Sequence, residues 1–232
     1  MKAEARVLRT KNFVTDAAGF VLEQARKTLA ERDEFRIALS GGNTPAPVYA
    51  RIAAEEHKLP WDQIRFTFSD ERCVAPDNPQ SNFRMARENL FVPGAVPEKS
   101  IMRMRGEIDP QIAAQEYEDQ LNTIAIESGE RIYQHDLILL GLGEDGHTAS
   151  LFPGTTALDD TTRRVVANFV PKLNAWRLTF TFLLINHARH VLFLVGASKN
   201  PQLIERVLAG DQQFPAARVN PSAGVVTWMI GE

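Results

Sequence analysis

Short apolar runs alternate with helical segments along the chain, and this alternation limits the possible folds more than any other feature. The runs LILLGLG at 137–143 and VLFLVG at 191–196 contain no polar side chain, as expected of strands that helices cover on both faces. Other segments have apolar residues at helical spacing, such as Ala113, Tyr117 and Leu121, which precede the first of these runs. The order predicts an α/β fold, a modified Rossmann-type, mostly parallel sheet flanked by helices.

The other predicted elements follow the same rules. Further strands are predicted at 35–40, 64–70, 163–170 and 224–231, and helices at 16–33, 44–57, 81–91, 109–124 and 201–210. Thr44 is the expected N-cap of one helix, with Pro45 at its first helical position, and Asp109 and Pro110 are expected to open another. The stretch ERCVAPDNPQ at 71–80 is predicted to be a loop. Segment 176–188 is ambiguous between strand and helix.

Composition excludes several classes of protein. The formal net charge is −3, and the chain has no block of five basic residues, so a nucleic-acid partner is not expected. Cys73 is the only cysteine, which rules out an intrachain disulfide. Neither a secretory signal nor an apolar stretch long enough to span a membrane is apparent. We therefore expect one domain over residues 1–232, in the cytoplasm, as a monomer or small homo-oligomer without a membrane partner.

Segments rich in glycine and in polar or charged residues follow four of the predicted strands. These segments are SGGNTP at 40–45, SDER at 69–72, GLGEDGHT at 141–148 and GASK at 196–199. In open α/β sheets, ligands bind beyond the carboxyl ends of the strands. If the sheet is parallel, all four segments meet at one edge, and this convergence indicates a binding site there.

The segment SGGNTP has the properties of a phosphate-binding turn. Gly41 and Gly42 allow close backbone approach, Ser40 and Thr44 offer hydroxyl groups, and a helix N-terminus favours an anion. It is not a Walker motif, because the G-x-x-x-x-G-K-[ST] pattern is absent. The simpler alternative is a tight turn followed by an N-cap.

Basic residues lie near the same predicted edge. Lys199 follows one strand directly, and Arg177 and Lys172 occur in VPKLNAWRLTF. Any of them could neutralise a bound phosphate. Each could equally be a solvated surface residue, and the sequence does not divide the phosphate-binding roles among them and Arg72.

In SDER, three ionisable residues follow a strand. Arg72 could orient an anion or an oxyanion, and Asp70 could contact a sugar hydroxyl. Alternatively, Asp70, Glu71 and Arg72 could pair with one another as ordinary loop charges.

The glycines at 141–146 satisfy the pattern G-x-G-x-x-G, so a dinucleotide site has to be considered. That fingerprint requires a long helix after the third glycine, whereas Pro153 follows within a few residues. It also requires an acid about 20 residues further on, and the nearest later acids are Asp159 and Asp160. A dinucleotide site is a poor fit.

His147 and Asp145 remain as the reactive groups of this segment. An imidazole with an ordinary pKa of about 6.5 can accept a proton near neutral pH, and a carboxylate can fix its tautomer. A metal site is weaker, because no second histidine stands at ligand spacing. A turn histidine without a catalytic role is the alternative.

The sequence resembles the 6-phosphogluconolactonase family, whose relatives include glucosamine-6-phosphate deaminase and, more distantly, ribose-5-phosphate isomerase. The resemblance spans residues 36–228 and rests on the motifs SGGNTP, SDERCVAPDNPQSNFRMARENL, GLGEDGHTASLFPGT, VPKLNAWRLTFT and GASKN, in this order. It implies hydrolysis of a sugar-phosphate lactone, 6-phospho-D-glucono-1,5-lactone, in the oxidative pentose phosphate pathway, with no metal and no organic cofactor.

The resemblance also implies roles for individual residues. His147 matches the proton-transfer histidine, with Asp145 as its partner and Arg72 near the reacting carbonyl. The phosphate and substrate contacts match Ser40, Gly41, Gly42, Thr44, Asp70, Lys199 and Arg177.

Two alternatives are expected to fail. The deaminase relatives have a glutamate five residues after the histidine, whereas this chain has Phe152. A sugar-phosphate sensor would need the phosphate loop but not His147, and only one helix is predicted before residue 36 to serve a DNA-binding unit.

Overall fold

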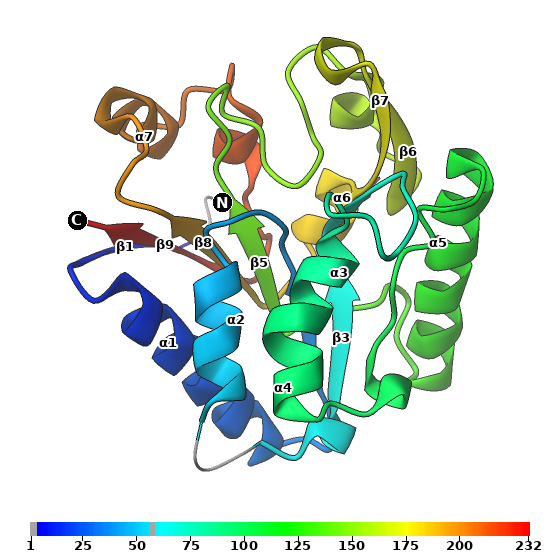
Figure 1. Cartoon of the computed structure of the whole chain (residues 1–232). Helices are drawn as coiled ribbons and strands as arrows, with labels where there is room; N and C mark the ends of the chain where they lie inside the picture. The colour runs from blue at the N-terminus through cyan, green and yellow to red at the C-terminus, as the bar shows by residue number, and fades with distance from the viewer. Residues whose placement is uncertain (1–3, 56–58) are drawn as a thin grey trace.

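The fold is built on a six-stranded sheet in which every pairing is parallel, with strand order β1-β9-β8-β5-β2-β3 (Figure 1). The computed structural model describes residues 4–55 and 59–232. In sheet order the strands are β1 (Glu4–Thr10), β9 (Val225–Gly231), β8 (His190–Val195), β5 (Leu137–Gly141), β2 (Phe35–Leu39) and β3 (Ile64–Phe68). The predicted α/β class with a mostly parallel sheet is confirmed.

Helices cover both faces of this sheet. One face packs against α1 (Phe13–Leu29), α2 (Ala46–Ala53) and the helical run α3 (Asn82–Ala86), η2 (Arg87–Phe91) and α4 (Val92–Gly94). The other face packs against α5 (Pro110–Glu127), α6 (Phe182–Ile185) and α7 (Pro201–Leu208). Short helical turns connect them: η1 (Trp61–Gln63), η3 (Glu98–Ser100), η4 (Thr156–Asp159), η5 (Pro171–Leu173) and η6 (Pro215–Arg218).

Strand β5 is apolar at every position because helices cover both of its faces. Leu137 and Leu139 belong to the core beneath α1 and α2, whereas Ile138 and Leu140 belong to the core beneath α5. Successive side chains of a strand point to opposite faces, so a strand covered on both sides needs an apolar residue at each position. The central position of β5 also directs its carboxyl end to the middle of the upper sheet edge in Figure 1.

A second, three-stranded antiparallel sheet stands beside this edge and was not predicted. It consists of β4 (Asp70–Arg72), β7 (Ala175–Phe180) and β6 (Val165–Val170). Ser69 links the two sheets, because its N–H donates to Leu39 and its carbonyl accepts from Phe180. The prediction that residues 71–80 form a loop is therefore wrong at its start. Glu71 and Arg72 have a strand partner far away in the sequence, which no local pattern reveals.

The predicted starts of two helices differ in outcome. Helix α5 begins at Pro110 as predicted, and the Asp109 carboxylate caps it by accepting from the backbone N–H groups of Gln111 and Ile112. The predicted N-cap at Thr44 is wrong: α2 begins one residue later, with Pro45 at the N-cap and no side-chain cap bond. The end of the same predicted helix, at residues 56 and 57, lies outside the described residues.

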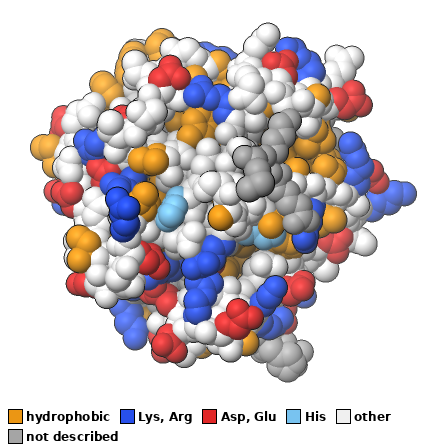
Figure 2. Space-filling model, turned by 180° about the vertical axis from the view of Figure 1, so that it is seen from behind, with side chains coloured by type: hydrophobic (Ala, Val, Ile, Leu, Met, Phe, Trp, Pro, Cys, Tyr) orange, Lys and Arg blue, Asp and Glu red, His pale blue; other side chains and the backbone are white. Residues whose placement is uncertain are grey.

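The ambiguous segment contains both elements, first β7 and then the short helix α6. Strand β1 was missed because its residues 5–9 are all exposed, so the strand has no apolar and polar alternation to detect. No helix within residues 4–55 and 59–232 combines the length and apolar character needed to cross a membrane. On the face shown in Figure 2, basic and acidic side chains are interspersed.

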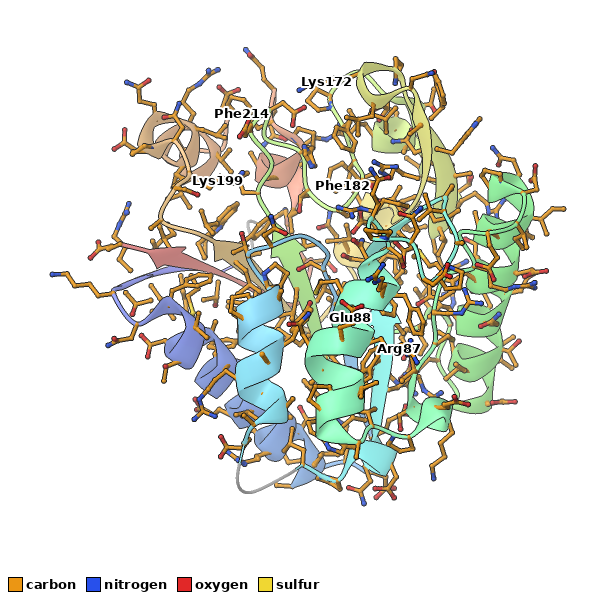
Figure 3. The ribbon with its side chains drawn as sticks, in the orientation of Figure 1. Arg87, Glu88, Lys172, Phe182, Lys199 and Phe214 are labelled. Carbon is orange, nitrogen blue, oxygen red and sulfur yellow. The ribbon has the colours of Figure 1, made fainter. Side chains whose placement is uncertain are left out.

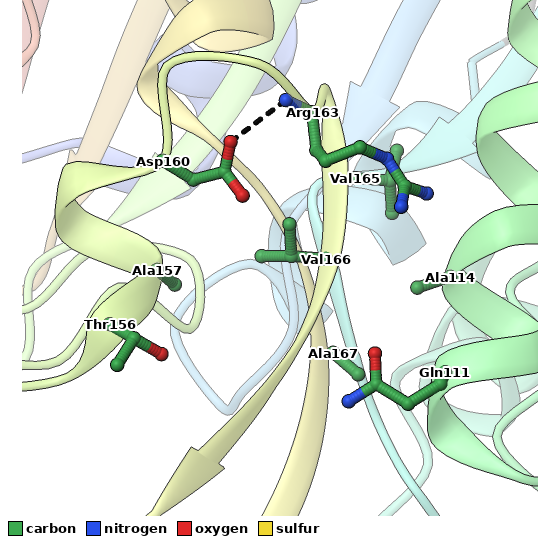
Figure 4. A pocket seen from close by; sticks show the side chains of 9 residues that line it. All are labelled: Gln111, Ala114, Thr156, Ala157, Asp160, Arg163, Val165, Val166 and Ala167. Carbon is green, nitrogen blue, oxygen red and sulfur yellow. Dashed lines mark hydrogen bonds between the residues drawn. The ribbon is translucent and has the colours of Figure 1, made fainter.

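A small hollow of about 210 Å³ lies between α5 and β6 on the flank of the molecule (Figure 4). Asp160 accepts a hydrogen bond from the backbone N–H of Arg163 at 2.8 Å, and the Arg163 guanidinium pairs with the buried carboxylate of Glu118. Both charged side chains that line this hollow thus already have a partner within the protein. None of the four segments that follow the strands contributes to its lining.

Candidate active site

A cleft of about 590 Å³ opens at the carboxyl ends of the parallel strands. All four segments singled out in the sequence contribute to it, as the parallel sheet predicts. Each of the ten predicted site residues lines this cleft: Ser40, Gly41, Gly42, Thr44, Asp70, Arg72, Asp145, His147, Arg177 and Lys199. The structure thus brings together groups that lie up to 159 positions apart, from residue 40 to residue 199.

His147 and Asp145 form a hydrogen-bonded pair on the loop after β5. The Asp145 Oδ1 atom lies 2.5 Å from His147 Nδ1 and accepts from the His147 backbone N–H at 3.3 Å. Because this carboxylate engages Nδ1, the Nε2 atom is left as the ring nitrogen that can exchange a proton with a ligand. Both side chains are about one quarter exposed, at 27% and 26%, so the pair is within reach of a ligand.

Asp145 is stabilised as a carboxylate. Its partial burial alone would raise the pKa, but the hydrogen bond and charge of His147 and the ammonium group of Lys172 lower it more. The Lys172 Nζ atom stands 3.2 Å from Asp145 Oδ2. Both carboxylate oxygens therefore have a partner, which fixes the orientation of the carboxylate.

The His147 ring packs against two neighbours on its own loop. The Phe152 ring stacks against it with centroids 3.9 Å apart and an interplanar angle of 24°. A Cβ atom at Gly143 would lie 2.1 Å from Nδ1 and Cε1 of His147. Only glycine leaves room for the ring at this position. No sequence pattern indicates either contact.

The C-terminal part of the chain supports the same loop. Gly146 has a φ of +75°, and a Cβ atom there would meet the Phe214 ring at 2.3 Å. The Gly146 carbonyl accepts a hydrogen bond from the backbone N–H of Ala216 at 3.0 Å. Glycine at 146 therefore allows both the turn and the close approach of the segment that contains Phe214.

The glycine loop after β2 is fixed by two helices. The Tyr49 hydroxyl on α2 donates to the Ser40 carbonyl at 2.8 Å and accepts from its N–H at 3.0 Å. A Cβ atom at Gly41 would lie 1.8 Å from Asn82 Oδ1, so α3 packs directly on the loop. The Ser40 hydroxyl is buried and has no hydrogen-bond partner among the described residues. A buried hydroxyl on a cleft wall is suited to bind a polar ligand.

Asp70 is engaged by the protein on both of its oxygens. It accepts from the Ser150 hydroxyl at 2.7 Å and from the Asn82 side-chain amide at 3.2 Å. Its side chain is buried, and its position ties β4 to the loop that carries His147. The carboxylate lines the cleft as predicted, but both of its oxygens already accept hydrogen bonds from the protein, from Asn82 and Ser150.

Glu71 does not pair with Asp70 or with the Arg72 guanidinium, as the loop-charge alternative required. Its buried carboxylate accepts from the backbone N–H groups of Arg72, Asn82 and Phe83 and from the Ser81 hydroxyl, at 2.7 to 3.1 Å. It thereby fixes the start of α3 and the strand that carries Arg72.

Two arginines stand side by side on the cleft wall. Arg72 and Arg177 are directly opposite each other on β4 and β7, so their side chains lie on one face of the small sheet. Burial, followed by the positive charge of Arg72, lowers the pKa of Arg177. Neighbouring like charges of this kind favour an anion.

Lys199 is on the loop between β8 and α7, and Lys172 is on the hairpin tip between β6 and β7. Figure 3 shows both lysines above the carboxyl ends of the strands, on separate elements. The Lys199 loop runs beside the glycine loop, since a Cβ atom added at Gly196 would lie 3.7 Å from the Thr44 hydroxyl.

No group of three or more His, Cys, Asp or Glu side chains among the described residues is arranged to hold a metal ion. Cys73 is half-buried, and burial raises the pKa of its thiol to about 11, so it is a poor nucleophile near neutral pH.

Comparisons with known proteins identify the family to which the chain belongs. Residues 9–228 match the family model described as glucosamine-6-phosphate isomerases/6-phosphogluconolactonase. The chain is 42% identical over 237 residues to a 6-phosphogluconolactonase of Synechocystis sp., an alignment that covers 100% of this chain and 97% of the relative. It is 36% identical over 235 residues to a 6-phosphogluconolactonase of Nostoc sp., with coverage of 99% and 96%. A crystal structure of 6-phosphogluconolactonase from Thermotoga maritima superposes with a TM-score of 0.86 at 30% identity, covering 99% of this chain and 100% of that one.

Proposed function

Because the chain belongs to the family of glucosamine-6-phosphate isomerases and 6-phosphogluconolactonases, we propose that it hydrolyses 6-phospho-D-glucono-1,5-lactone to 6-phospho-D-gluconate. This reaction is a step of the oxidative pentose phosphate pathway. The observation that carries the proposal is the cleft itself, in which a hydrogen-bonded histidine and aspartate share one cavity with a glycine loop and several cations. The enzyme is accordingly a lactone hydrolase.

We assign the phosphate of the substrate to the glycine loop and Lys199. Ser40, Gly41, Gly42 and Thr44 offer backbone and hydroxyl groups on one cleft wall, and the Lys199 loop runs beside this wall near Thr44. The loop also leads into α2, whose N-terminal dipole favours an anion. Binding energy from this non-reacting end would hold the lactone carbonyl near His147.

His147 is proposed as the general base that removes a proton from the water attacking the lactone carbonyl. General-base catalysis of this kind contributes about 10²–10⁴-fold to a rate. Asp145 fixes the ring tautomer and stabilises the imidazolium that forms. The protonated His147 then returns its proton to the departing ring oxygen, so no covalent intermediate is needed.

The tetrahedral intermediate bears a negative charge on the former carbonyl oxygen. Arg72 is proposed to stabilise it, and Arg177, directly opposite on β7, to contact the substrate as well. Asp70 would accept from a sugar hydroxyl with the capacity that Ser150 and Asn82 leave. No metal ion has a part in this scheme.

The contact at Phe152 favours a lactonase over the isomerase branch of the family. The deaminase relatives have a glutamate at the corresponding position, five residues after the histidine, and use it in ring-opening chemistry. Here that position holds an apolar ring, which stacks on His147, in place of the glutamate.

The test is turnover of freshly prepared phosphorylated lactone in a pH-stat, with the spontaneous hydrolysis subtracted. We expect kcat/KM for the phosphorylated lactone to exceed that for unphosphorylated glucono-1,5-lactone by at least two orders of magnitude, roughly the value of two charge-assisted hydrogen bonds. Equal rates for the two lactones would refute the phosphate assignment. Activity should survive EDTA unchanged, and a loss that a divalent ion restores would refute metal independence.

A further inference from the structure

Lys172 occupies an unusual place among the cations of the cleft. It belongs to η5, the tip of the hairpin between β6 and β7, which is part of the small sheet with β4 and not of the large sheet. Figure 3 shows its side chain at the upper end of the molecule, on a different element from Lys199. The hairpin thus brings a positive charge to the cleft from the side of the small sheet.

The contact that Lys172 makes is directed at Asp145. Its Nζ atom lies 3.2 Å from Oδ2, while the other carboxylate oxygen, Oδ1, faces Nδ1 of His147 at 2.5 Å. Within the described part of the chain, Lys172 and His147 are the two ion-pair partners that Asp145 has. One carboxylate therefore links a lysine on the hairpin to a histidine on the β5 loop.

We propose that Lys172 is a positioning residue for the reaction proposed above: it holds Asp145 in line with His147 and takes up part of the carboxylate charge that faces the imidazole. This inference assigns Lys172 to the base end of the cleft, apart from the phosphate. It rests on the proposed function only for its catalytic consequence, because the ion pair itself exists without substrate.

The negative charge of the Asp145 carboxylate acts on both the His147 imidazole and the Lys172 ammonium group. A carboxylate alone beside an imidazole favours the imidazolium strongly, which would occupy the base with a proton before water arrives. An ammonium group on the second oxygen offsets part of that attraction. It also restricts rotation of the carboxylate, so Oδ1 stays directed at the ring nitrogen.

Other charged groups act on His147 as well, and they remain in place when Lys172 is changed. Those lining the same cleft are Asp145 and Glu144 on its own loop, Asp70 and Arg72 on β4, Arg177 on β7, and Lys199 before α7. Of these, only Asp145 is hydrogen-bonded to the imidazole within the described residues. A change at Lys172 therefore acts on the ring mainly through that carboxylate.

A phosphate-binding role is the alternative for Lys172, and the geometry favours the positioning role. Its ammonium group is committed to Asp145, at the opposite end of the proposed substrate from the glycine loop. The Lys172 side chain is 70% exposed, so solvent weakens its ion pair with Asp145. We therefore expect substitution of Lys172 to reduce the activity of His147 as a base moderately and not to abolish it.

The experiment compares wild type with Lys172→Met, Lys172→Arg and Lys99→Met. Lys99 is an exposed residue of η3 outside the cleft lining, so its substitution is a matched control for the loss of one positive charge. Two measurements are made: the pH dependence of kcat and kcat/KM for the phosphorylated lactone, and NMR titration of the His147 ring, assigned with a His147→Asn variant.

For Lys172→Met we expect the ring titration midpoint to rise by roughly 0.2 to 0.7 pH units, the value of one exposed ion pair. The acidic limb of the pH profile, along which the base loses its proton, should move with it, and kcat should fall roughly two- to fivefold with little change in KM. Lys172→Arg should restore both, and Lys99→Met should match wild type.

A rise in KM with an unchanged titration midpoint would overturn the proposal, because it would mean that Lys172 binds the substrate phosphate. A lower melting temperature with an unchanged midpoint would also overturn it, because the role would then be structural. The NMR titration needs no turnover, so it decides the question of Lys172 even if the wild-type protein failed to hydrolyse the lactone.

Discussion

Substitution of Gly143 by alanine tests the geometry of the proposed base without removing any of its groups. The φ of Gly143 is not in the positive range, so alanine fits the backbone there. The new Cβ atom, however, would lie 2.1 Å from Nδ1 and Cε1 of His147, and ordinary contact begins at 3.4 Å. Ordinary contact is restored when the ring moves by about 1.3 Å, the difference between these two distances. That movement also disturbs the stacking of the ring on Phe152, whose centroid lies 3.9 Å away.

A misplacement of about 1 Å at a reacting group can cost about 10²-fold in rate. We therefore expect Gly143→Ala to reduce kcat/KM for the phosphorylated lactone by about two orders of magnitude, with the fold intact by circular dichroism. Gly19→Ala is the matched control, because a Cβ atom at Gly19 in α1 meets nothing within 4 Å. The control should retain full activity and gain up to about 1 kcal/mol of stability, the helix preference of alanine over glycine. Wild-type kcat/KM in a folded Gly143→Ala protein would refute the proposed position of the base.

Two further predictions concern stability. Burial, with the charge of Arg36 next in importance, lowers the pKa of His135 to about 3, so the unfolded chain binds a proton below about pH 6.5 that the folded state does not. The free energy of unfolding should therefore fall as the pH decreases below 6.5, by about 2 kcal/mol at pH 5. Urea titrations should show a smaller loss for His135→Gln than for wild type. Equal losses in both proteins would show that His135 is not the cause. Glu71→Gln places an amide donor against backbone N–H groups and should lower the free energy of unfolding by about 2–4 kcal/mol. The exposed Glu88→Gln should change it by less than about 0.5 kcal/mol, and equal effects would contradict the role assigned to Glu71.

The parts of the fold that the sequence predicts are those with a local signature. Strand β5 is recognisable because both of its faces are buried, and α5 because Asp109 and Pro110 mark its start. Strand β1 has exposed side chains at 5–9 and gains its stability from pairing with β9, at the other end of the chain. The pairing of β4 with β7 likewise depends on segments about 100 residues apart and has no local signature.

The same distinction applies to the cleft. Its lining could be predicted because the carboxyl ends of parallel strands share one edge, so residues after different strands converge there. The individual bonds could not be predicted, since they join distant segments. Asp70 binds Ser150 across 80 positions, and Lys172 reaches Asp145 from an element whose direction depends on the unpredicted small sheet.

The identity of the proton acceptor is the central claim, and the most direct measurement is kcat/KM of His147→Ala with the phosphorylated lactone, corrected for spontaneous hydrolysis. The variant keeps the glycine loop and the cations, so binding of the product 6-phosphogluconate, measured by calorimetry, should persist. We expect kcat/KM to fall by about 10²–10⁴-fold, the usual contribution of a general base. Wild-type kcat/KM in the folded variant would contradict the account.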